Sequence, residues 1–235
     1  MSTAELREST KERPPLRPST RLVLVRHGQA GGAGIPYTNE VPLTATGRRQ
    51  AERTATAIAL DGSGAGVAAI YSSPHRRALD SARALAARMQ RELQVDDRLM
   101  EFRLGCEDTQ SIDEIVEELR YLMLWRPHDR ESDRGESLWQ FQSRVSAFLD
   151  EASNACLGRS AVIFTHGGTI AAAMRWAYGL TPEHDWHSDV EIFNASITEV
   201  EFWPNGRHAL SAPYASVVHR LNDIRHLPAD LVTAY

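Results

Sequence analysis

Three short apolar runs, separated by longer amphipathic segments, constrain the fold of this chain more than any other feature. The runs cover residues 21–25, 67–71 and 160–165 and consist mainly of aliphatic and β-branched side chains. Runs of this length are typical of strands buried in a parallel sheet. Because helical patterns alternate with these runs, the sequence predicts an α/β fold: a three-layer sandwich with a mostly parallel central sheet flanked by helices.

Apolar periodicity and capping signals predict the remaining elements. The expected helices cover residues 44–60, 78–89, 111–123, 137–152 and 169–178. Thr44 is the expected N-cap of the first helix, and a capping box opens the helix at 111–123. Residues 197–202 alternate with period two, which indicates a more exposed strand.

The chain is expected to form one domain preceded by an arm. Residues 1–20 contain three prolines, mixed charge and few apolar side chains, so we expect a flexible N-terminal arm. Residues 21–235 contain no internal repeat and are expected to form a single domain, with a helical insertion near 105–135.

Composition excludes several classes of partner. The net charge of −5 gives no reason to expect a nucleic acid or an anionic membrane, and no apolar stretch approaches the length of a membrane span. Cys106 and Cys156 are the two cysteines, without the spacing of a zinc site or a disulfide framework. We therefore expect a cytoplasmic protein with no bound metal and no cofactor.

Each apolar run ends in a polar or basic cluster. The first ends in Arg26-His27-Gly28, the second is followed by residues 72–77, and the third ends at residues 165–168. Taken alone, Arg26-His27-Gly28 equally fits a strand end whose side chains meet solvent. The carboxyl ends of parallel strands lie on one edge of the sheet, where ligands usually bind. Two arginines and two histidines would therefore converge there on an oxyanion, beside helix N-termini that add partial positive charge.

Eight segments, taken in order, resemble the histidine phosphatase superfamily, which includes cofactor-dependent phosphoglycerate mutases and many phosphatases. They are LVLVRHGQA at 22–30, LTATGRRQA at 43–51, YSSPHRRALDSA at 71–82, LMEF at 99–102, GESLWQFQSR at 135–144, FTHGG at 164–168, NASITEVEF at 194–202 and LNDIRHL at 221–227. The resemblance covers nearly all of the chain from residue 21 onward. It implies a phosphoglycerate mutase-like fold.

The resemblance also implies the roles of the strand-end residues. His27 would be the nucleophile that becomes phosphohistidine, and His166 would complete the phosphate pocket as a cationic donor. Arg26 and Arg77 would clamp the phosphoryl oxygens with their planar guanidinium groups.

The choice of Arg77 over its neighbour follows the family pattern, in which the arginine directly precedes an alanine, here Ala78. His75 and Arg76 are expected to be solvated side chains at a helix start.

Glu101 matches the family position of the general acid, which protonates the leaving alcohol and then activates water. A surface glutamate after a strand is the alternative reading. Glu136 is the competing carboxylate, expected to cap a helix and orient the pocket. The asparagine that many members carry after the RHG motif is absent, so Gln29 or nearby backbone amides would bind phosphate, together with Gly167.

These features favour a metal-independent phosphatase that acts on a small phosphorylated metabolite, with a homodimer possible. A mutase would need further basic residues in the insertion, where residues 105–135 carry arginines but also many acids. A non-catalytic phospho-ligand binding module is a third reading. The presence of all the catalytic residue types argues against it.

Overall fold

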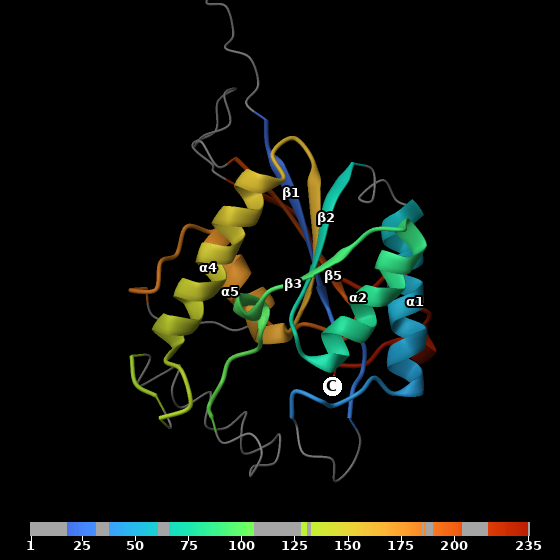
Figure 1. Ribbon diagram of the computed structural model, residues 1–235, viewed down its shortest axis with the longest axis horizontal. Helices are drawn as coiled ribbons and strands as arrows, with labels where there is room; N and C mark the ends of the chain where they lie inside the picture. The colour runs from blue at the N-terminus through green and yellow to red at the C-terminus, as the bar shows by residue number, and fades with distance from the viewer. Residues whose placement is uncertain are drawn as a thin grey trace, which may run out of the picture.

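A six-stranded sheet forms the centre of the computed structural model (Figure 1), which describes residues 18–31, 38–60, 66–105, 128–130, 133–184, 186, 190–203 and 216–234. The strands are β1 (Thr20–Arg26), β2 (Val67–Ser72), β3 (Leu93–Val95), β4 (Ser160–Thr165), β5 (Ile197–Phe202) and β6 (Ser216–Asp223). Their order across the sheet is β3-β2-β4-β1-β5-β6. β1 to β4 pair in parallel, whereas β5 is antiparallel to both of its neighbours, so the sheet is mostly parallel as predicted.

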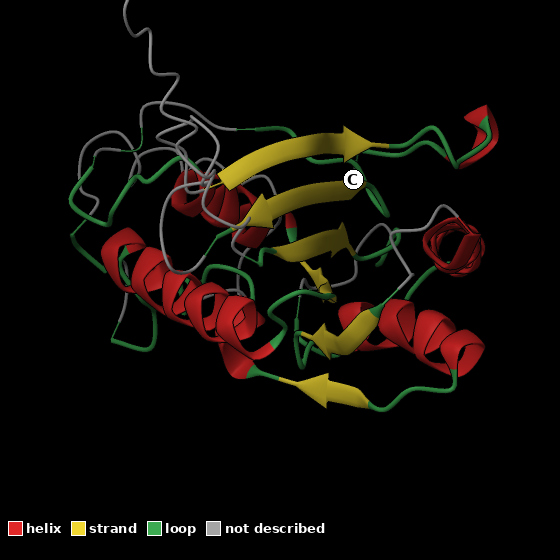
Figure 2. Ribbon diagram, turned by 90° about the horizontal axis from the view of Figure 1, so that it is seen from above, coloured by secondary structure: helices red, strands yellow, loops and turns green. Residues whose placement is uncertain are grey.

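Helices cover both faces of this sheet, which completes the predicted three layers (Figure 2). The helices α1 (Ala45–Leu60) and α2 (Arg76–Met89) lie together on one face, and α4 (Leu138–Ala155) and α5 (Gly167–Ala177) lie on the other. Two short 3-10 helices, η1 (Asp97–Leu99) and η2 (Ala229–Leu231), complete the described elements. No described helix has the length and apolar character needed to cross a bilayer.

Side-chain alternation in the central strands builds two separate cores. Leu22 and Leu24 of β1 pack into the core beneath α4 and α5, whereas Val23 and Val25 pack into the core beneath α1 and α2. All four are at most 1% exposed. A strand buried on both faces needs apolar residues at every position, which explains why the first run is continuous rather than alternating.

The strand β5 corrects one expectation. Its first four residues are buried, because β5 pairs with β1 on one side and β6 on the other. Its polar residue Glu199 is buried as an ion pair with Arg21 at 3.1 Å and accepts a hydrogen bond from Arg220 Nε at 2.7 Å. The period-two alternation therefore reflects paired polar side chains rather than an exposed face.

Several expectations fall on residues outside the described ranges. They include most of the arm, residues 1–17, and most of the insertion, residues 106–127, with its predicted helix at 111–123. Thr20, placed in the arm by the sequence, is fully buried and begins β1. The strands β3 and β6 were not expected. β3 has three residues, and β6 alternates between half-buried and exposed positions without an apolar face.

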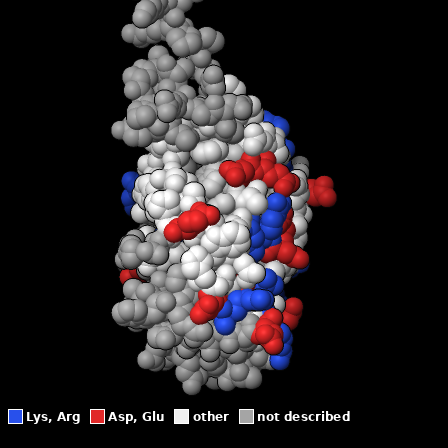
Figure 3. Space-filling view, turned by 90° about the vertical axis from the view of Figure 1, so that its left-hand side faces the viewer, with Lys and Arg blue, Asp and Glu red and all other residues white. Residues whose placement is uncertain are grey.

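Charges are mixed on the surface shown in Figure 3, where basic and acidic side chains lie interspersed. The described part of this face therefore has no extended basic surface of the kind that tracks a nucleic-acid backbone.

Candidate active site

The three predicted strand-end clusters meet at one edge of the sheet. The amide of His27 donates to the Thr165 carbonyl at 2.9 Å, and the amide of Ser73 donates to the Phe164 carbonyl at 3.0 Å. These bonds join the chain leaving β1 and the chain leaving β2 to the end of β4. The rings of His27 and His166 consequently lie edge to face, with centroids 5.2 Å apart.

His27 is held in one orientation and one tautomer. Its Nδ1 lies 2.7 Å from the Gly28 carbonyl, and its Nε2 accepts a hydrogen bond from Arg77 Nε at 3.2 Å. Since the carbonyl can only accept, Nδ1 carries the proton and Nε2 carries the lone pair. Burial, reinforced by Arg77 and Arg26, holds the pKa of His27 well below its ordinary value. The ring is therefore neutral, as a nitrogen nucleophile must be.

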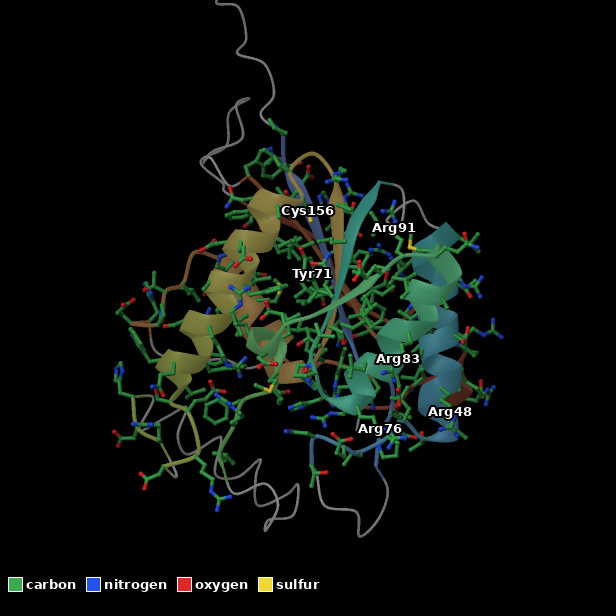
Figure 4. All side chains as sticks on the ribbon, in the orientation of Figure 1. Arg48, Tyr71, Arg76, Arg83, Arg91 and Cys156 are labelled. Carbon is green, nitrogen blue, oxygen red and sulfur yellow. The ribbon has the colours of Figure 1, made fainter. Side chains whose placement is uncertain are left out.

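The structure brings Arg77, rather than Arg76, to His27. The Arg77 side chain is 1% exposed, and its Nη1 also donates to the Thr38 carbonyl at 3.1 Å. Arg76 lies in the first turn of α2 with 53% of its side chain exposed, 3.7 Å from Asp80 (Figure 4). This difference follows from helix geometry, since successive residues of α2 point about 100° apart.

Arg26 extends from the end of β1 toward the start of α5. A side-chain carbon on Gly167 would lie 3.7 Å from Arg26 Nε, so this guanidinium borders the helix N-terminus at which an anion is favoured. Its Nη1 also donates to the backbone carbonyls of Ile192 and, at 2.7 Å, Ala234. Arg26 therefore connects the candidate site to the C-terminal segment.

Two further side chains hold that segment. Gln50 Nε2 donates to the Leu231 carbonyl at 2.7 Å and to Thr233 Oγ1 at 2.9 Å. The side-chain amide of Asn194 donates to Thr233 Oγ1 at 3.0 Å, and its backbone amide donates to the Thr233 carbonyl at 3.0 Å. On its other side, Gln50 Oε1 accepts from the amide of Gln29 at 2.7 Å. Gln50 is fully buried and thus links the loop after β1 to residues 231–234, a positioning role that sequence reasoning missed.

His166 depends on Ser73, which sequence reasoning noted only as part of a polar cluster. Its Nε2 lies 2.8 Å from Ser73 Oγ, and the same oxygen accepts from the His75 amide at 3.3 Å. Ser73 can donate its own proton to Nε2 while it accepts from this amide, and we adopt that pairing for His166. The ring proton of His166 then lies on Nδ1, which is buried and has no hydrogen-bond partner among the described residues.

The sequence predicts a cationic His166, and the structure does not favour one. Burial, followed by the charge of Arg77, holds the pKa of His166 well below its ordinary value. In the free site this side chain is therefore neutral.

His75 contradicts the expectation of a solvated side chain. It is 5% exposed, and its ring lies edge to face on His166 with centroids 4.7 Å apart. The reason is its position as the N-cap of α2, whose start is held by the Arg76 amide donating to the Asn39 carbonyl at 2.9 Å. An extended N-cap residue at this strand end turns its side chain inward, beside His166.

Glu101 lies at the N-terminus of α5, next to His166. Its carboxylate accepts from the amide of Gly168 at 3.0 Å and from the amide of Phe102 at 3.0 Å. A side-chain carbon on Gly168 would collide with the Glu101 carboxylate, so this glycine permits the approach. Glu101 is half-buried at this helix start, and its role as general acid stays a prediction.

Glu136 holds the Glu101 segment through Arg144. Arg144 donates to both carboxylate oxygens of Glu136, at 2.8 and 2.6 Å, and its remaining donors reach the carbonyls of Arg98, Met100 and Glu101. The expected helix cap is instead Ser137, whose side chain and Gln140 form a capping box at the start of α4. Glu136 is buried and acts on the site through an arginine rather than through the helix terminus.

The loop after β1 packs tightly on the first helix. A side-chain carbon on Gly28 would collide with the Gly47 carbonyl, and one on Gly47 would collide with the Gln29 carbonyl. The Gln29 side-chain carbonyl accepts from Thr44 Oγ1 at 2.8 Å, and Thr44 in turn accepts from the Gly47 amide at 3.0 Å, as expected of an N-cap. That Gln29 binds phosphate stays a prediction.

Three buried neutral histidines predict a loss of stability in mildly acidic solution. The pKa values of His27 and His166 lie well below the ordinary value, and that of His75 is lowered to about 3 by burial and by Arg77. Below about pH 6.5 the unfolded chain binds protons that the native chain does not. As the pH is lowered, the free energy of unfolding therefore decreases by roughly 1 kcal/mol per pH unit for each histidine.

Urea unfolding between about pH 5 and pH 7.5 measures this slope, in a window above the titration of ordinary carboxylates. The variant His75→Leu is expected to show a shallower slope, because one of the three groups is removed. An unfolding free energy that stays constant across this window would contradict the neutral assignment.

Within the described ranges, no group of three or more His, Cys, Asp or Glu side chains is placed to hold a metal ion. Arg77 lies close to the three clustered imidazoles of His27, His75 and His166. Its positive charge favours binding of an anion beside these rings.

Comparisons with known proteins agree with this geometry. The model of the histidine phosphatase superfamily (branch 1) matches residues 22–212. The probable phosphoglycerate mutase GpmB of Escherichia coli is 27% identical over 219 residues, covering 89% of this chain and 95% of that protein. A putative phosphoserine phosphatase 2 of Hydrogenobacter thermophilus is 31% identical over 134 residues, covering 56% of this chain and 64% of that protein.

Solved structures show the same architecture. A mycobacterial hydrolase 2 superimposes with a TM-score of 0.71 at 25% identity, covering 91% of this chain and 95% of its own. A mycobacterial glucosyl-3-phosphoglycerate phosphatase gives 0.67 at 26% identity, covering 88% and 99%. With a family model that spans most of the sequence and strand ends that meet as its motifs require, this chain belongs to the histidine phosphatase superfamily.

Proposed function

We propose that this chain is a phosphatase that hydrolyses a small phosphomonoester through a phosphohistidine at His27, without a metal. The observation that carries the proposal is the fixed state of His27, whose Nδ1 faces the Gly28 carbonyl and whose neutral Nε2 faces Arg77. Arg77, Arg26 and the Nδ1–H of His166 supply the donors that stabilise charge on the phosphoryl oxygens.

In the first step, the lone pair of His27 Nε2 forms a bond to phosphorus while the ester P–O bond breaks. The departing electron pair stays on the alkyl oxygen, which takes a proton from Glu101. In the second step, water attacks phosphorus, Glu101 takes a proton from that water, and the P–N bond breaks to restore the neutral imidazole. The α5 amide that binds Glu101, from Gly168, keeps this carboxyl at the same edge as His166.

Hydrolysis and mutase chemistry share the first step and differ in the acceptor. Relatives with either name match this chain: a probable phosphoglycerate mutase and a putative phosphoserine phosphatase. We favour hydrolysis because the insertion near 105–135 mixes arginines with many acids, which does not suit a second phosphate. A non-catalytic binding module would not need a neutral nucleophile beside a proton donor.

The proposed partner is a small phosphorylated metabolite in the cytoplasm. The support for a small substrate is the named specificity of a relative at 26% identity, a glucosyl-3-phosphoglycerate phosphatase. A homodimer is compatible with the proposal and is not required by it.

Trapping the intermediate tests the proposal. After a rapid mix of p-nitrophenyl phosphate with enzyme in excess EDTA, we expect one phosphoryl group on the protein that survives alkali and is lost in acid, as phosphohistidine is. Peptide mapping should place it on His27. Turnover without any covalent phosphate, or turnover restored only by added zinc or magnesium, would contradict the proposal. Product analysis with 3-phosphoglycerate, with and without bisphosphoglycerate, separates hydrolysis from mutase activity.

A further inference from the structure

A third histidine, His75, lies beside the two histidines of the proposed mechanism and has no role in it. Its side chain is 5% exposed, yet neither ring nitrogen has a hydrogen-bond partner among the described residues. A buried imidazole without partners is costly, because the ring loses water and gains no replacement bond. An apolar side chain would fill this position at lower cost, so packing alone does not explain a histidine here.

The position of His75 relates it to the alcohol half of a substrate rather than to the nucleophile. Its ring contacts His166 at 4.7 Å between centroids, and His166 in turn contacts His27 at 5.2 Å. Besides burial, the positive charges of Arg77, Arg144 and Arg103 all lower the pKa of His75. Arg144 also donates to the Glu101 carbonyl at 3.0 Å. The Glu101 carboxylate accepts from the amide of Gly168, two residues after His166, so His75 and Glu101 both neighbour His166.

In-line transfer places the leaving oxygen opposite the attacking nitrogen. Glu101 must reach that oxygen, so the side chains that neighbour Glu101 at this edge, His75 among them, are the ones placed to meet the alcohol half of the substrate. The ring of His75 is neutral, with its pKa lowered to about 3 by burial and by Arg77. It therefore offers one N–H donor and one lone pair rather than a charge.

We propose that His75 is a specificity-determining residue, which donates a hydrogen bond to an oxygen, carboxylate or hydroxyl, on the alcohol half of the substrate. The inference rests on the proposed phosphatase function and deepens it. Esters whose alcohol carries such an oxygen satisfy the buried N–H, whereas esters of a plain aromatic alcohol leave it without a partner. A site built to bind a polar group rejects an analogue that lacks it.

The selectivity of His75→Leu tests this role. We measure kcat/KM for three esters. 3-Phosphoglycerate carries a carboxylate and a hydroxyl, glycerol 3-phosphate carries two hydroxyls, and phenyl phosphate carries neither group. The ratio of the better polar substrate to phenyl phosphate is expected to fall about 10-fold or more in His75→Leu. The variant His75→Gln keeps an N–H donor and should restore part of the ratio. Loss with 3-phosphoglycerate alone assigns a carboxylate, and loss that includes glycerol 3-phosphate assigns a hydroxyl.

Arg76→Ala is the matched control, since Arg76 is the neighbouring residue with 53% of its side chain exposed. Its selectivity ratio should equal that of the wild type. A structural role for His75 would instead lower kcat/KM for all three esters equally, together with the melting temperature. Either that result or an unaltered ratio in His75→Leu would overturn the inference.

A binding measurement separates this inference from the proposed function. Calorimetry of 3-phosphoglycerate and glycerol 3-phosphate with His27→Ala and with His27→Ala/His75→Leu needs no turnover. About 10-fold weaker binding of one of them by the double variant supports the role of His75, even if the wild-type enzyme hydrolyses neither ester. Equal affinity of the two variants for both ligands would exclude it.

Discussion

Replacing His27 by alanine is expected to lower kcat for every phosphomonoester by about ten-thousand-fold or more and to remove all covalent phosphate. The reason is the position of its Nε2, the lone pair of which faces Arg77 at 3.2 Å. Alanine leaves Arg77, Arg26 and His166 in place, so the pocket keeps its donors but has no nitrogen to attack phosphorus. Steady-state kinetics and the alkali-stable label measure the two effects independently.

Circular dichroism and thermal melting check that the variant folds, since alanine also removes the hydrogen bonds that His27 makes with Gly28 and Arg77. His219→Ala is a suitable control: His219 lies on β6, 37% exposed, 2.9 Å from Glu201, and should retain full activity. Substantial turnover by a folded His27→Ala protein would exclude the phosphohistidine mechanism.

Glu101→Gln has the second largest expected effect, and its size should depend on the leaving group. For an alkyl ester such as glycerol 3-phosphate we expect a loss of about 100- to 10,000-fold in kcat/KM, the range of general acid catalysis. For p-nitrophenyl phosphate the loss should be much smaller, because p-nitrophenolate leaves without a proton.

Glu136→Gln provides the matched carboxylate control. Glu136 is bound by Arg144 at 2.6 and 2.8 Å and reaches the site through the backbone of the Glu101 segment. Its replacement should cause a smaller loss than Glu101→Gln, with a weaker dependence on the leaving group, since it displaces the Glu101 segment and leaves the Glu101 carboxyl itself intact. If the leaving-group dependence appears in Glu136→Gln and not in Glu101→Gln, the proton donor is Glu136.

The sequence predicts the sheet well because its central strands are buried on both faces. Continuous apolar runs leave little freedom in β1, β2 and β4, and the polar residues that follow them must then meet at one edge. This convergence follows from sheet topology alone. Whether a side chain at the boundary of an element is buried does not follow from sheet topology, and His75 is an example. Whether an N-cap side chain meets solvent depends on neighbours distant in sequence, here the His166 ring.

The burial of polar residues in the strand β5 is likewise not predictable from sequence pattern alone. Glu199 reads as an outward-facing side chain until the strands on both sides supply Arg21 and Arg220. Gln50 is a further case, since its partners lie in the loop after β1 and at residues 231–234. Side chains that join distant segments leave no periodic signal, and sequence patterns cannot locate their partners.

The anchoring of residues 231–234 has a consequence for biosynthesis. Arg26 lies at the end of the first strand, and its hydrogen bond to the Ala234 carbonyl joins parts of the chain separated by 208 positions. A nascent chain that has already formed β1, β2 and β4 still lacks this partner until residue 234 has been added. The Arg26 guanidinium, which borders the proposed phosphate site, therefore gains this hydrogen bond only after residues 231–234 have docked beside β1.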